Sequence, residues 1–286
     1  MRFAFKTSPQ NTSWSDMLTV WTAADEIDVF ESGWTFDHFY PIFSDPTGPC
    51  LEGWVTLTAL AQATRRLRVG VLVTGIHYRH PAVLANMAST LDVVSDGRLE
   101  LGIGAGWNEE ESGAYGIELG TVKERFDRFE EACQVLRGLL SQETTSFDGR
   151  FYQLKDARNE PKGPQQPHPP ICIGGSGEKR TLRITAQYAD HWNFVGGTPE
   201  EFARKRDVLA GHCADIGRDP HEIRLSAHIR LSPDHDYDRA ISEAAALGEE
   251  GLDLAIIYLP PPYDPAVLEP LADKIRGSGL LDSKQA

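Results

Sequence analysis

Residues 66–104 read RLRVGVLVTGIHYRHPAVLANMASTLDVVSDGRLELGIG, in which a helical pattern stands between two apolar runs. Its first part, 66–75, is an apolar run rich in valine, which predicts a buried strand. A helix is predicted next, because Pro81 suits the first helical position and Gly97 follows the last periodic residue. The apolar run 98–104 predicts a second strand. A strand, a helix and a strand in this order form one βαβ unit.

The same alternation runs along the whole chain. Predicted strands lie at 2–5, 32–37, 66–75, 98–104, 171–175, 191–197, 223–232 and 252–260. Predicted helices lie at 14–27, 51–64, 81–97, 108–114, 124–140, 178–188, 198–216, 238–247 and 264–275. Eight such units in 286 residues, with no obvious linker, predict one domain over 1–286, a (β/α)8 TIM barrel. An open, doubly wound sheet also alternates strands and helices and is the alternative fold.

An insert at 141–170 interrupts this alternation. Within it, TTSFDGRFYQL (144–154) predicts a hairpin closed by the turn Asp148-Gly149. The following PKGPQQPHPP (161–170) is too rich in proline for a helix or a strand and predicts an ordered surface connection. We expect the insert on the top face of the barrel, where it would help the loop 40–50 to close a pocket.

The composition excludes several classes of function. A net charge of −14 argues against a nucleic-acid partner, because phosphate binding needs a basic surface. No apolar run is long enough for a membrane span, and MRFAFKTSPQ lacks the apolar core of a signal peptide, so we expect a cytoplasmic protein. Its four separated cysteines indicate reduced thiols. His77 and His80 have no accompanying ligand pattern, so no metal is expected.

In a barrel the chemistry lies at the carboxyl ends of the strands. The topology therefore singles out a small set of residues, namely Phe36 to His38, Thr74 to His77, Gly104 to Asn108, Gly174 to Gly177, Asn193, His228 and Tyr258. Among them, His38 is the candidate for proton transfer, because histidine titrates near neutral pH. Asp37 is its candidate partner. A purely structural histidine is the alternative interpretation.

Two glycine-rich segments differ in what they predict. Gly104, Ala105 and Gly106 have the wrong spacing and position for a dinucleotide fingerprint, but their small size lets a planar group lie against the barrel mouth. Asn108 is a candidate helix cap, and the glutamates that follow it suit the positive end of a helix. Gly174, Gly175, Ser176 and Gly177 offer free N–H groups at a helix start and predict a phosphate site, with a tight turn as the alternative.

Five blocks together resemble the luciferase-like monooxygenase superfamily, and most closely its actinobacterial branch of F420-dependent oxidoreductases. The blocks are WTFDHF (34–39), VLVTGIHYRHP (71–81), GRLELGIGAGWNEEESGAYGI (97–117), ERFDRFEE (124–131) and IGGSGEKRTLRITAQYADHWN (173–193). The resemblance covers essentially the whole chain. It implies a (β/α)8 barrel that is usually dimeric and binds a flavin or deazaflavin in its mouth.

The resemblance also implies roles for residues. Asp37 and His38 match the Asp-His pair beside the deazaflavin ring in F420-using members, whereas flavin-using members more often carry Glu-His-His. The segment Thr74, Gly75 and Ile76 matches a bulge behind the ring, with a non-proline cis peptide expected at Gly75-Ile76. The other implied cofactor contacts are Gly104, Ala105, Gly106 and Asn108 along the ring and Gly174, Gly175, Ser176 and Gly177 at its phosphate.

One position departs from the sugar-phosphate dehydrogenases of this superfamily. They carry a catalytic glutamate just after the glycines of the fourth strand, where this chain has Trp107. The departure argues against sugar-phosphate oxidation and favours a more apolar substrate pocket. Trp107 and Tyr115 are the candidate walls of that pocket, although Tyr115 suits a core position equally well.

The expected function is hydride transfer between a reduced deazaflavin, coenzyme F420, and a small organic substrate of unknown identity. The acidic tail of coenzyme F420 suits a chain of net charge −14 poorly, so Arg79, Lys179 and Arg180 would have to offset the charge of that tail. One alternative is an FMN-dependent monooxygenase that receives reduced flavin from a separate reductase. The other is a non-catalytic flavin-binding protein. A homodimer is expected in each case.

Overall fold

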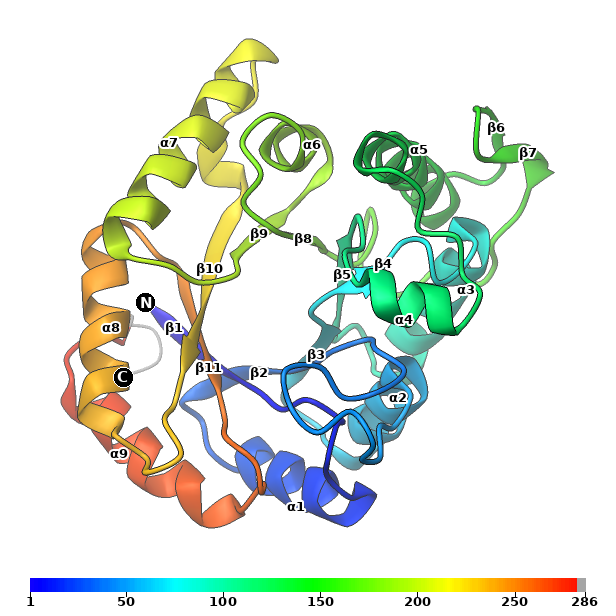
Figure 1. The fold of residues 1–286 in the computed structure, drawn as a ribbon. Helices are drawn as coiled ribbons and strands as arrows, with labels where there is room; N and C mark the ends of the chain where they lie inside the picture. The colour runs from blue at the N-terminus through cyan, green and yellow to red at the C-terminus, as the bar shows by residue number, and fades with distance from the viewer. Residues whose placement is uncertain (282–286) are drawn as a thin grey trace.

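The computed structural model describes residues 1–281 and shows a closed parallel barrel of eight strands surrounded by helices (Figure 1). Around the barrel the strands are β1 (Arg2–Lys6), β2 (Phe30–Thr35), β3 (Arg68–Val71), β5 (Leu99–Gly104), β8 (Ile171–Gly174), β9 (His191–Phe194), β10 (Arg224–Arg230) and β11 (Leu254–Tyr258). β1 pairs with β11 and β3 pairs with β5, so the sheet has no open edge. The predicted barrel is confirmed, and the open doubly wound sheet is wrong. Residues 282–286 of the predicted domain lie outside the described residues.

The predicted strand 66–75 is divided into two. After β3, the chain leaves the barrel wall and returns as the short β4 (Thr74–Gly75), which pairs with the end of β5. The non-proline cis peptide is Leu72–Val73, not Gly75-Ile76 as expected. This division has no signal in the sequence, because the apolar run continues through it unbroken.

Helices follow the strands and cover the outside of the barrel (Figure 1). They are α1 (Trp14–Asp25), α2 (Gly53–Ala63), α3 (Pro81–Val94), α4 (Glu109–Ala114), α5 (Val122–Ser141), α6 (Thr181–Tyr188), α7 (Pro199–Asp215), α8 (Tyr237–Glu249) and α9 (Leu268–Gly277), with short 3₁₀ turns at Pro220–Glu222 and Pro265–Val267. Side chains cap the first turns of all these helices except α6 and α9, and Ser13, Thr121 and Thr198 do so by reciprocal bonds with the third helical residue. Pro81 occupies the first turn of α3, as predicted.

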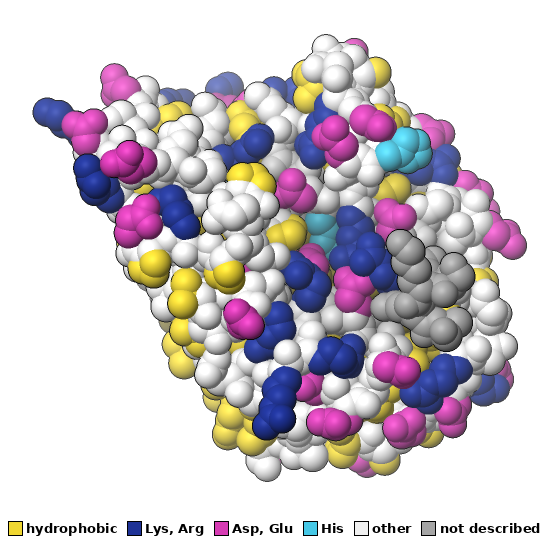
Figure 2. Space-filling view, turned by 180° about the vertical axis from the view of Figure 1, so that it is seen from behind, with side chains coloured by type: hydrophobic (Ala, Val, Ile, Leu, Met, Phe, Trp, Pro, Cys, Tyr) yellow, Lys and Arg dark blue, Asp and Glu magenta, His cyan; other side chains and the backbone are white. Residues whose placement is uncertain are grey.

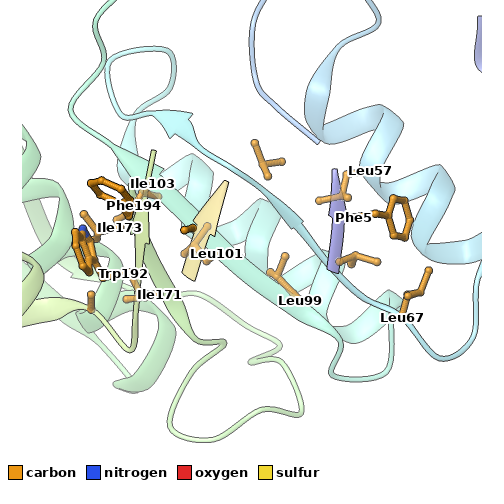
Figure 3. Close-up of a cluster of buried hydrophobic side chains, with 14 of the residues drawn as sticks. Phe5, Leu57, Leu67, Leu99, Leu101, Ile103, Ile171, Ile173, Trp192 and Phe194 are labelled. Atoms are coloured by element: carbon orange, nitrogen blue, oxygen red, sulfur yellow. The ribbon is translucent and has the colours of Figure 1, made fainter. Parts of the chain in front are cut away.

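Side chains alternate between the two faces of the barrel wall. On β1, Phe3 and Phe5 point outward into the large core between strands and helices, while Ala4 lies in a small interior cluster with Trp34. Lys6 follows the inward set and lines the barrel mouth. Figure 3 shows part of the large core, including Phe5, Leu99, Leu101, Ile171 and Trp192.

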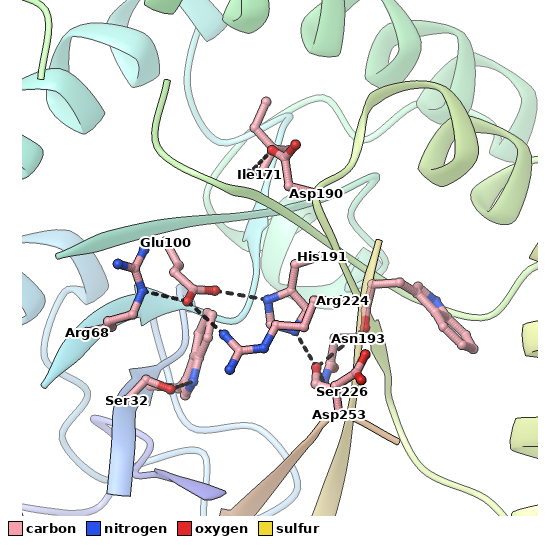
Figure 4. Close-up of polar contacts among 12 residues, drawn as sticks. Ser32, Arg68, Glu100, Ile171, Asp190, His191, Asn193, Arg224, Ser226 and Asp253 are labelled. Carbon is pink, nitrogen blue, oxygen red and sulfur yellow. Dashed lines mark hydrogen bonds and ion pairs between the residues drawn. The ribbon is translucent and has the colours of Figure 1, made fainter. Parts of the chain in front are cut away.

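Polar side chains fill the amino-terminal part of the barrel interior (Figure 4). Glu100 accepts from Arg68 Nε at 2.9 Å, and its other oxygen lies 3.0 Å from His191 Nδ1. His191 Nε2 lies 2.6 Å from the hydroxyl of Ser226, and Arg224 lies on the same carboxylate as Arg68. Burial would raise the pKa of Glu100, but His191 and the two arginines hold that pKa far below its usual range.

The insert does not lie on the top face. Its hairpin, β6 (Thr145–Asp148) and β7 (Gln153–Ala157), packs outside the barrel against α5, where the carboxylate of Glu131 accepts the backbone N–H groups of 150–152. Gln165 then bonds the carbonyl of Leu99 at the amino-terminal end of β5. The expected position is wrong because α5 ends at the bottom of the barrel, so a segment between α5 and β8 starts there. Residues 141–170 line no part of the cavity described below.

Candidate functional site

A cavity of about 530 Å³ opens at the carboxyl ends of the barrel strands. Most of the predicted site residues line it, namely Asp37, His38, Gly75, Gly104, Ala105, Gly106, Trp107, Gly174 and Gly175. The lining also includes Asn193, His228 and Tyr258, which the topology singled out. Thr74, Ile76, Asn108, Ser176, Gly177 and Tyr115 lie outside the lining. The barrel therefore brings residues from nearly every strand end to one hollow.

His38 is held by a glutamate from another strand end. Its Nδ1 lies 2.7 Å from Oε2 of Glu111, which is fully buried. The same carboxylate accepts from the hydroxyl of Tyr78 and from the backbone N–H of Phe39. Burial raises the pKa of Glu111, but these hydrogen bonds outweigh it and hold the pKa below its ordinary value. An ionised Glu111 keeps a proton on Nδ1 and turns the other ring nitrogen, Nε2, to the cavity.

Sequence reasoning assigned Glu111 only to the helix end. Asn108 does cap α4, as predicted, and its side chain accepts from the backbone of Glu111. That cap fixes the first turn so that Glu111 points inward, whereas Glu109 and Glu110 face solvent. The position of Glu111, three residues after the cap Asn108, could have indicated that its side chain is held in place, but nothing in the sequence linked it to His38.

The sequence suggested Asp37 as the partner of His38, but the structure pairs Asp37 with Arg79 instead. Its carboxylate receives both terminal nitrogens of Arg79, one of them at 3.0 Å, and Arg79 also binds Glu52 at 2.6 Å. Burial lowers the pKa of Arg79, but the hydrogen bond and charge of Asp37 outweigh it and raise that pKa. Arg79 therefore already has two acidic partners at the barrel rim.

A smooth wall of glycines lies behind the cavity. A Cβ on Gly104 would stand 2.8 Å from Cγ2 of Val73, and one on Gly174 would stand 3.0 Å from Cγ1 of the same valine. These glycines make room for Val73, which lies between β3 and β4, and thereby leave a surface of backbone and one apolar side chain. A flat ring system fits against such a surface.

The second glycine segment has the features of an anion site. Gly175 has a φ of +119°, which favours glycine, and its carbonyl accepts from the indole of Trp192 at 2.7 Å. Within residues 1–281, the buried hydroxyl of Ser176 has no hydrogen-bond partner. Arg180 binds Asp127 at 2.7 Å, while Lys179 is exposed. The free hydroxyl and the open turn before α6 fit a phosphate, with Lys179 as the available cation.

The two predicted pocket walls differ in position. Trp107 packs edge-on against His38, with ring centroids 5.8 Å apart, and stacks on Phe43 at 5.5 Å. Tyr115 instead lies outside, where its hydroxyl donates to the carbonyl of Phe39 at 3.3 Å. Tyr115 therefore supports the loop after β2 and reaches the cavity only through it.

These features define a (β/α)8 barrel whose cavity has a glycine-lined wall and a histidine–glutamate pair at the carboxyl ends of the strands. The chain belongs to the luciferase-like monooxygenase family, whose model matches residues 1–270. In the part of the chain that the structure describes, no helix is both long enough and apolar enough to cross a membrane. Residues 1–281 also contain no group of three or more His, Cys, Asp or Glu side chains that could hold a metal ion.

Individual relatives carry two kinds of name. An "F420-dependent glucose-6-phosphate dehydrogenase" of Microbacterium testaceum is 28% identical over 284 residues, covering 96% of this chain and 80% of the relative. A "pyrimidine monooxygenase RutA" of Methylobacterium radiotolerans is 36% identical over 198 residues, covering 67% of this chain and 50% of the relative. Among solved structures, an "F420-dependent secondary alcohol dehydrogenase in complex with an F420-acetone adduct" superposes with a TM-score of 0.85 at 20% identity, covering 98% and 99% of the two chains.

Proposed function

We propose that the protein is an F420-dependent oxidoreductase that transfers hydride between the deazaflavin and a small organic substrate. The observation that carries the proposal is the His38–Glu111 pair at the edge of a cavity with a glycine wall. Several relatives with F420-dependent names, including a "hydroxymycolic acid dehydrogenase" of Mycobacterium tuberculosis at 31% identity, support the choice of cofactor. The bound deazaflavin would supply the hydride chemistry.

Each part of the site has a task in this proposal. The surface of Val73, Gly104 and Gly174 would support the ring, and the turn at Ser176 and Gly177 would hold the phosphate. His38 would donate or accept the substrate proton at Nε2, while Glu111 holds the Nδ1 proton and stabilises the charged ring. Trp107 would exclude water on the outer side.

A cofactor titration tests the proposal. We expect F420 to bind the purified protein and to change its fluorescence, with FMN binding at least about tenfold more weakly. The expected catalytic variant, His38→Ala, should keep F420 binding and lose turnover. Tight FMN binding without F420 binding would overturn the proposal.

A second candidate function is FMN-dependent monooxygenation with flavin from a separate reductase. Two observations favour it, namely the 36% identity with the pyrimidine monooxygenase and the engagement of Arg79 and Arg180 by acidic partners. These bonds leave Lys179 as the exposed cation near the phosphate turn for an acidic tail. Consumption of oxygen with reduced FMN would identify this reaction.

The proposal includes a homodimer formed through α2 and α3. α2 contains no charged residue, and the one charged residue of α3, Asp92, is buried. Exposed side chains on the two helices are instead valine, alanine and uncharged polar residues, namely Val55, Ala59, Gln62, Ala63, Val83, Asn86, Thr90, Val93 and Val94. Seen from behind, hydrophobic side chains gather along one edge of the molecule (Figure 2). The chain carries a net charge of −14, yet this face is uncharged and partly apolar, which favours its contact with a second copy of the chain.

Light scattering tests the dimer. Val83→Glu should convert the dimer to a monomer, because it buries a charge in the contact. Val122→Glu, at an equally exposed position on α5, should leave the mass unchanged. A monomeric wild-type protein would contradict this part of the proposal.

A further inference from the structure

Three basic side chains converge on one wall of the cavity, from the two strands that flank β11. Lys6 on β1 and Arg230 on β10 are both in register with Tyr258 on β11. The ammonium of Lys6 and the guanidinium of Arg230 each lie 5.2 Å from the centre of the Tyr258 ring, on which both pack. His228 precedes Arg230 by two residues, so it faces the same side, with its ring centre 6.3 Å from that of Tyr258. We call these four residues the cationic wall.

The cations of this wall lack acidic partners. Lys6 is 5% exposed and donates to the carbonyl of Leu72 at 2.9 Å. Among residues 1–281, none of Lys6, His228 and Arg230 forms an ion pair, and Nε2 of His228 has no hydrogen-bond partner. By contrast, Arg79 and Arg180 at the same end of the barrel each bind a carboxylate. A buried cation without a counter-charge is costly, so this arrangement is unusual for a purely structural role.

Electrostatics within the wall show the cost. Burial, together with the charge of Arg230, lowers the pKa of Lys6 to about 7. Burial also lowers the pKa of His228 well below its ordinary value, with Lys6 and Arg230 adding to the shift. An anion placed between Lys6 and Arg230 would favour the charged form of the lysine and repay its burial.

We propose that the cationic wall binds a carboxylate of the substrate, so that the protein acts on an organic acid with an apolar body. This inference rests on the proposed function, because only that function makes the bound acid the substrate. The wall adjoins β2, after which His38 lies, and Phe36, Ile42, Phe43 and Val195 supply apolar lining in the same cavity. A substrate anchored at Lys6 would thus extend over apolar side chains toward His38.

The chemistry of the wall favours a carboxylate over a phosphate. It offers side-chain cations around an aromatic ring, whereas the glycine-rich turn with the unpartnered Ser176 hydroxyl lies outside the cavity lining. A carboxylate is a planar monoanion and can pair with Lys6 and Arg230 beside the Tyr258 ring while its apolar body extends into the cavity.

The test compares benzoate with its neutral isostere benzamide by calorimetry on the purified, cofactor-free protein. We expect benzoate to bind at least about tenfold more tightly, because only benzoate meets the charges. Lys6→Met keeps the length of the side chain and removes a buried charge, so it should fold and lose that preference. Arg230→Gln, at the exposed rim, should weaken it. Lys155→Met, on an exposed lysine of β7 outside the cavity, should keep it.

The pH dependence gives an independent readout. Benzoate affinity should fall as the pH rises through about 7, because Lys6 loses its proton, and this fall should vanish in Lys6→Met. The groups that face Lys6 are Arg230 and His228 on β10, Tyr258 on β11 and Cys172 on β8. Burial raises the pKa of the Cys172 thiol, so it stays neutral across this range.

The outcomes separate this inference from the proposed function. Equal binding of benzoate and benzamide, or a full preference in Lys6→Met, would overturn the cationic wall as an anion site. Phenyl phosphate binding more tightly than benzoate would overturn the carboxylate assignment. We expect benzoate to bind in the presence of saturating F420, and strict competition would assign the wall to the cofactor instead. A protein that binds benzoate at Lys6 but not F420 would contradict the proposed function and leave the anion site standing.

Discussion

His38 Nδ1 and Glu111 Oε2 lie 2.7 Å apart although 73 residues separate them in the chain. Glu111 is fully buried, and the two residues come from the loop after β2 and from the first turn of α4. This pair sets the tautomer of a histidine that lines the cavity and packs edge-on against Trp107.

Glu111→Gln should lower turnover by about 10²- to 10⁴-fold, because the amide cannot stabilise a charged His38. Affinity for the cofactor should change little, since Glu111 does not line the cavity. Glu110→Gln, on the exposed side of the same helix, is the matched control and should retain activity. The measurement is a pH–rate profile of both variants, and wild-type turnover in Glu111→Gln would contradict the role assigned to the pair.

Gly104→Ala should destabilise the protein by about 1–3 kcal/mol, because the new Cβ would meet Val73 at 2.8 Å and press it into the cavity. Cofactor affinity should fall with stability, since Val73 forms the ring surface. Gly211→Ala in α7 has open space at its Cβ and should instead stabilise the protein by about 0.5–1 kcal/mol. Denaturant unfolding and cofactor titration of the two variants check this contrast, and equal effects would refute it.

Ser176→Ala should weaken cofactor binding without changing stability. The hydroxyl of Ser176 has no partner within residues 1–281, so its removal breaks no internal bond. Loss of one hydrogen bond to a phosphate should raise the dissociation constant about tenfold. Thermal unfolding and cofactor titration measure the two quantities separately. An unchanged dissociation constant would place the phosphate elsewhere.

Glu100→Gln should destabilise the protein by about 3 kcal/mol at neutral pH, because it leaves Arg68, Arg224 and His191 with a weaker partner. The folded pKa of Glu100 lies below its unfolded value, so its contribution is fully present above about pH 5. It is lost as the pH falls through the unfolded pKa toward the folded one. The difference in unfolding free energy between wild type and variant should therefore shrink in acid, and a constant difference would contradict this assignment.

The alternation of apolar runs with capped helices was enough to predict the barrel, because both periodicities are local. Local patterns also placed Gly104, Gly174 and His38 at strand ends. They could not show that Glu111 holds His38 or that Arg79 holds Asp37, since each pair depends on how distant strand ends meet. The divided strand at Leu72–Val73 was missed for a related reason, because its hydrophobicity is continuous.

Lys6 was missed because the first strand was predicted to end at residue 5. The structure continues β1 through Lys6, and the inward position of Ala4 fixes that of Lys6 by alternation. The alternation of side chains along β1 was therefore enough to place Lys6 inside the barrel, once the strand was known to end at Lys6. The position of the insert was mistaken because its sequence indicates a hairpin but not the end of the barrel at which α5 stops.

The pairing of β1 with β11 also orders events during synthesis. Lys6 leaves the ribosome long before Tyr258, its neighbour in the sheet, because Tyr258 belongs to β11. Until β11 emerges, β1 presents an unpaired edge, which in nascent chains is prone to pair with other chains. The wall that surrounds Lys6 is thus the last part of the cavity to exist, and a chain truncated before Leu254 would carry His38 and its glutamate without a closed barrel around them.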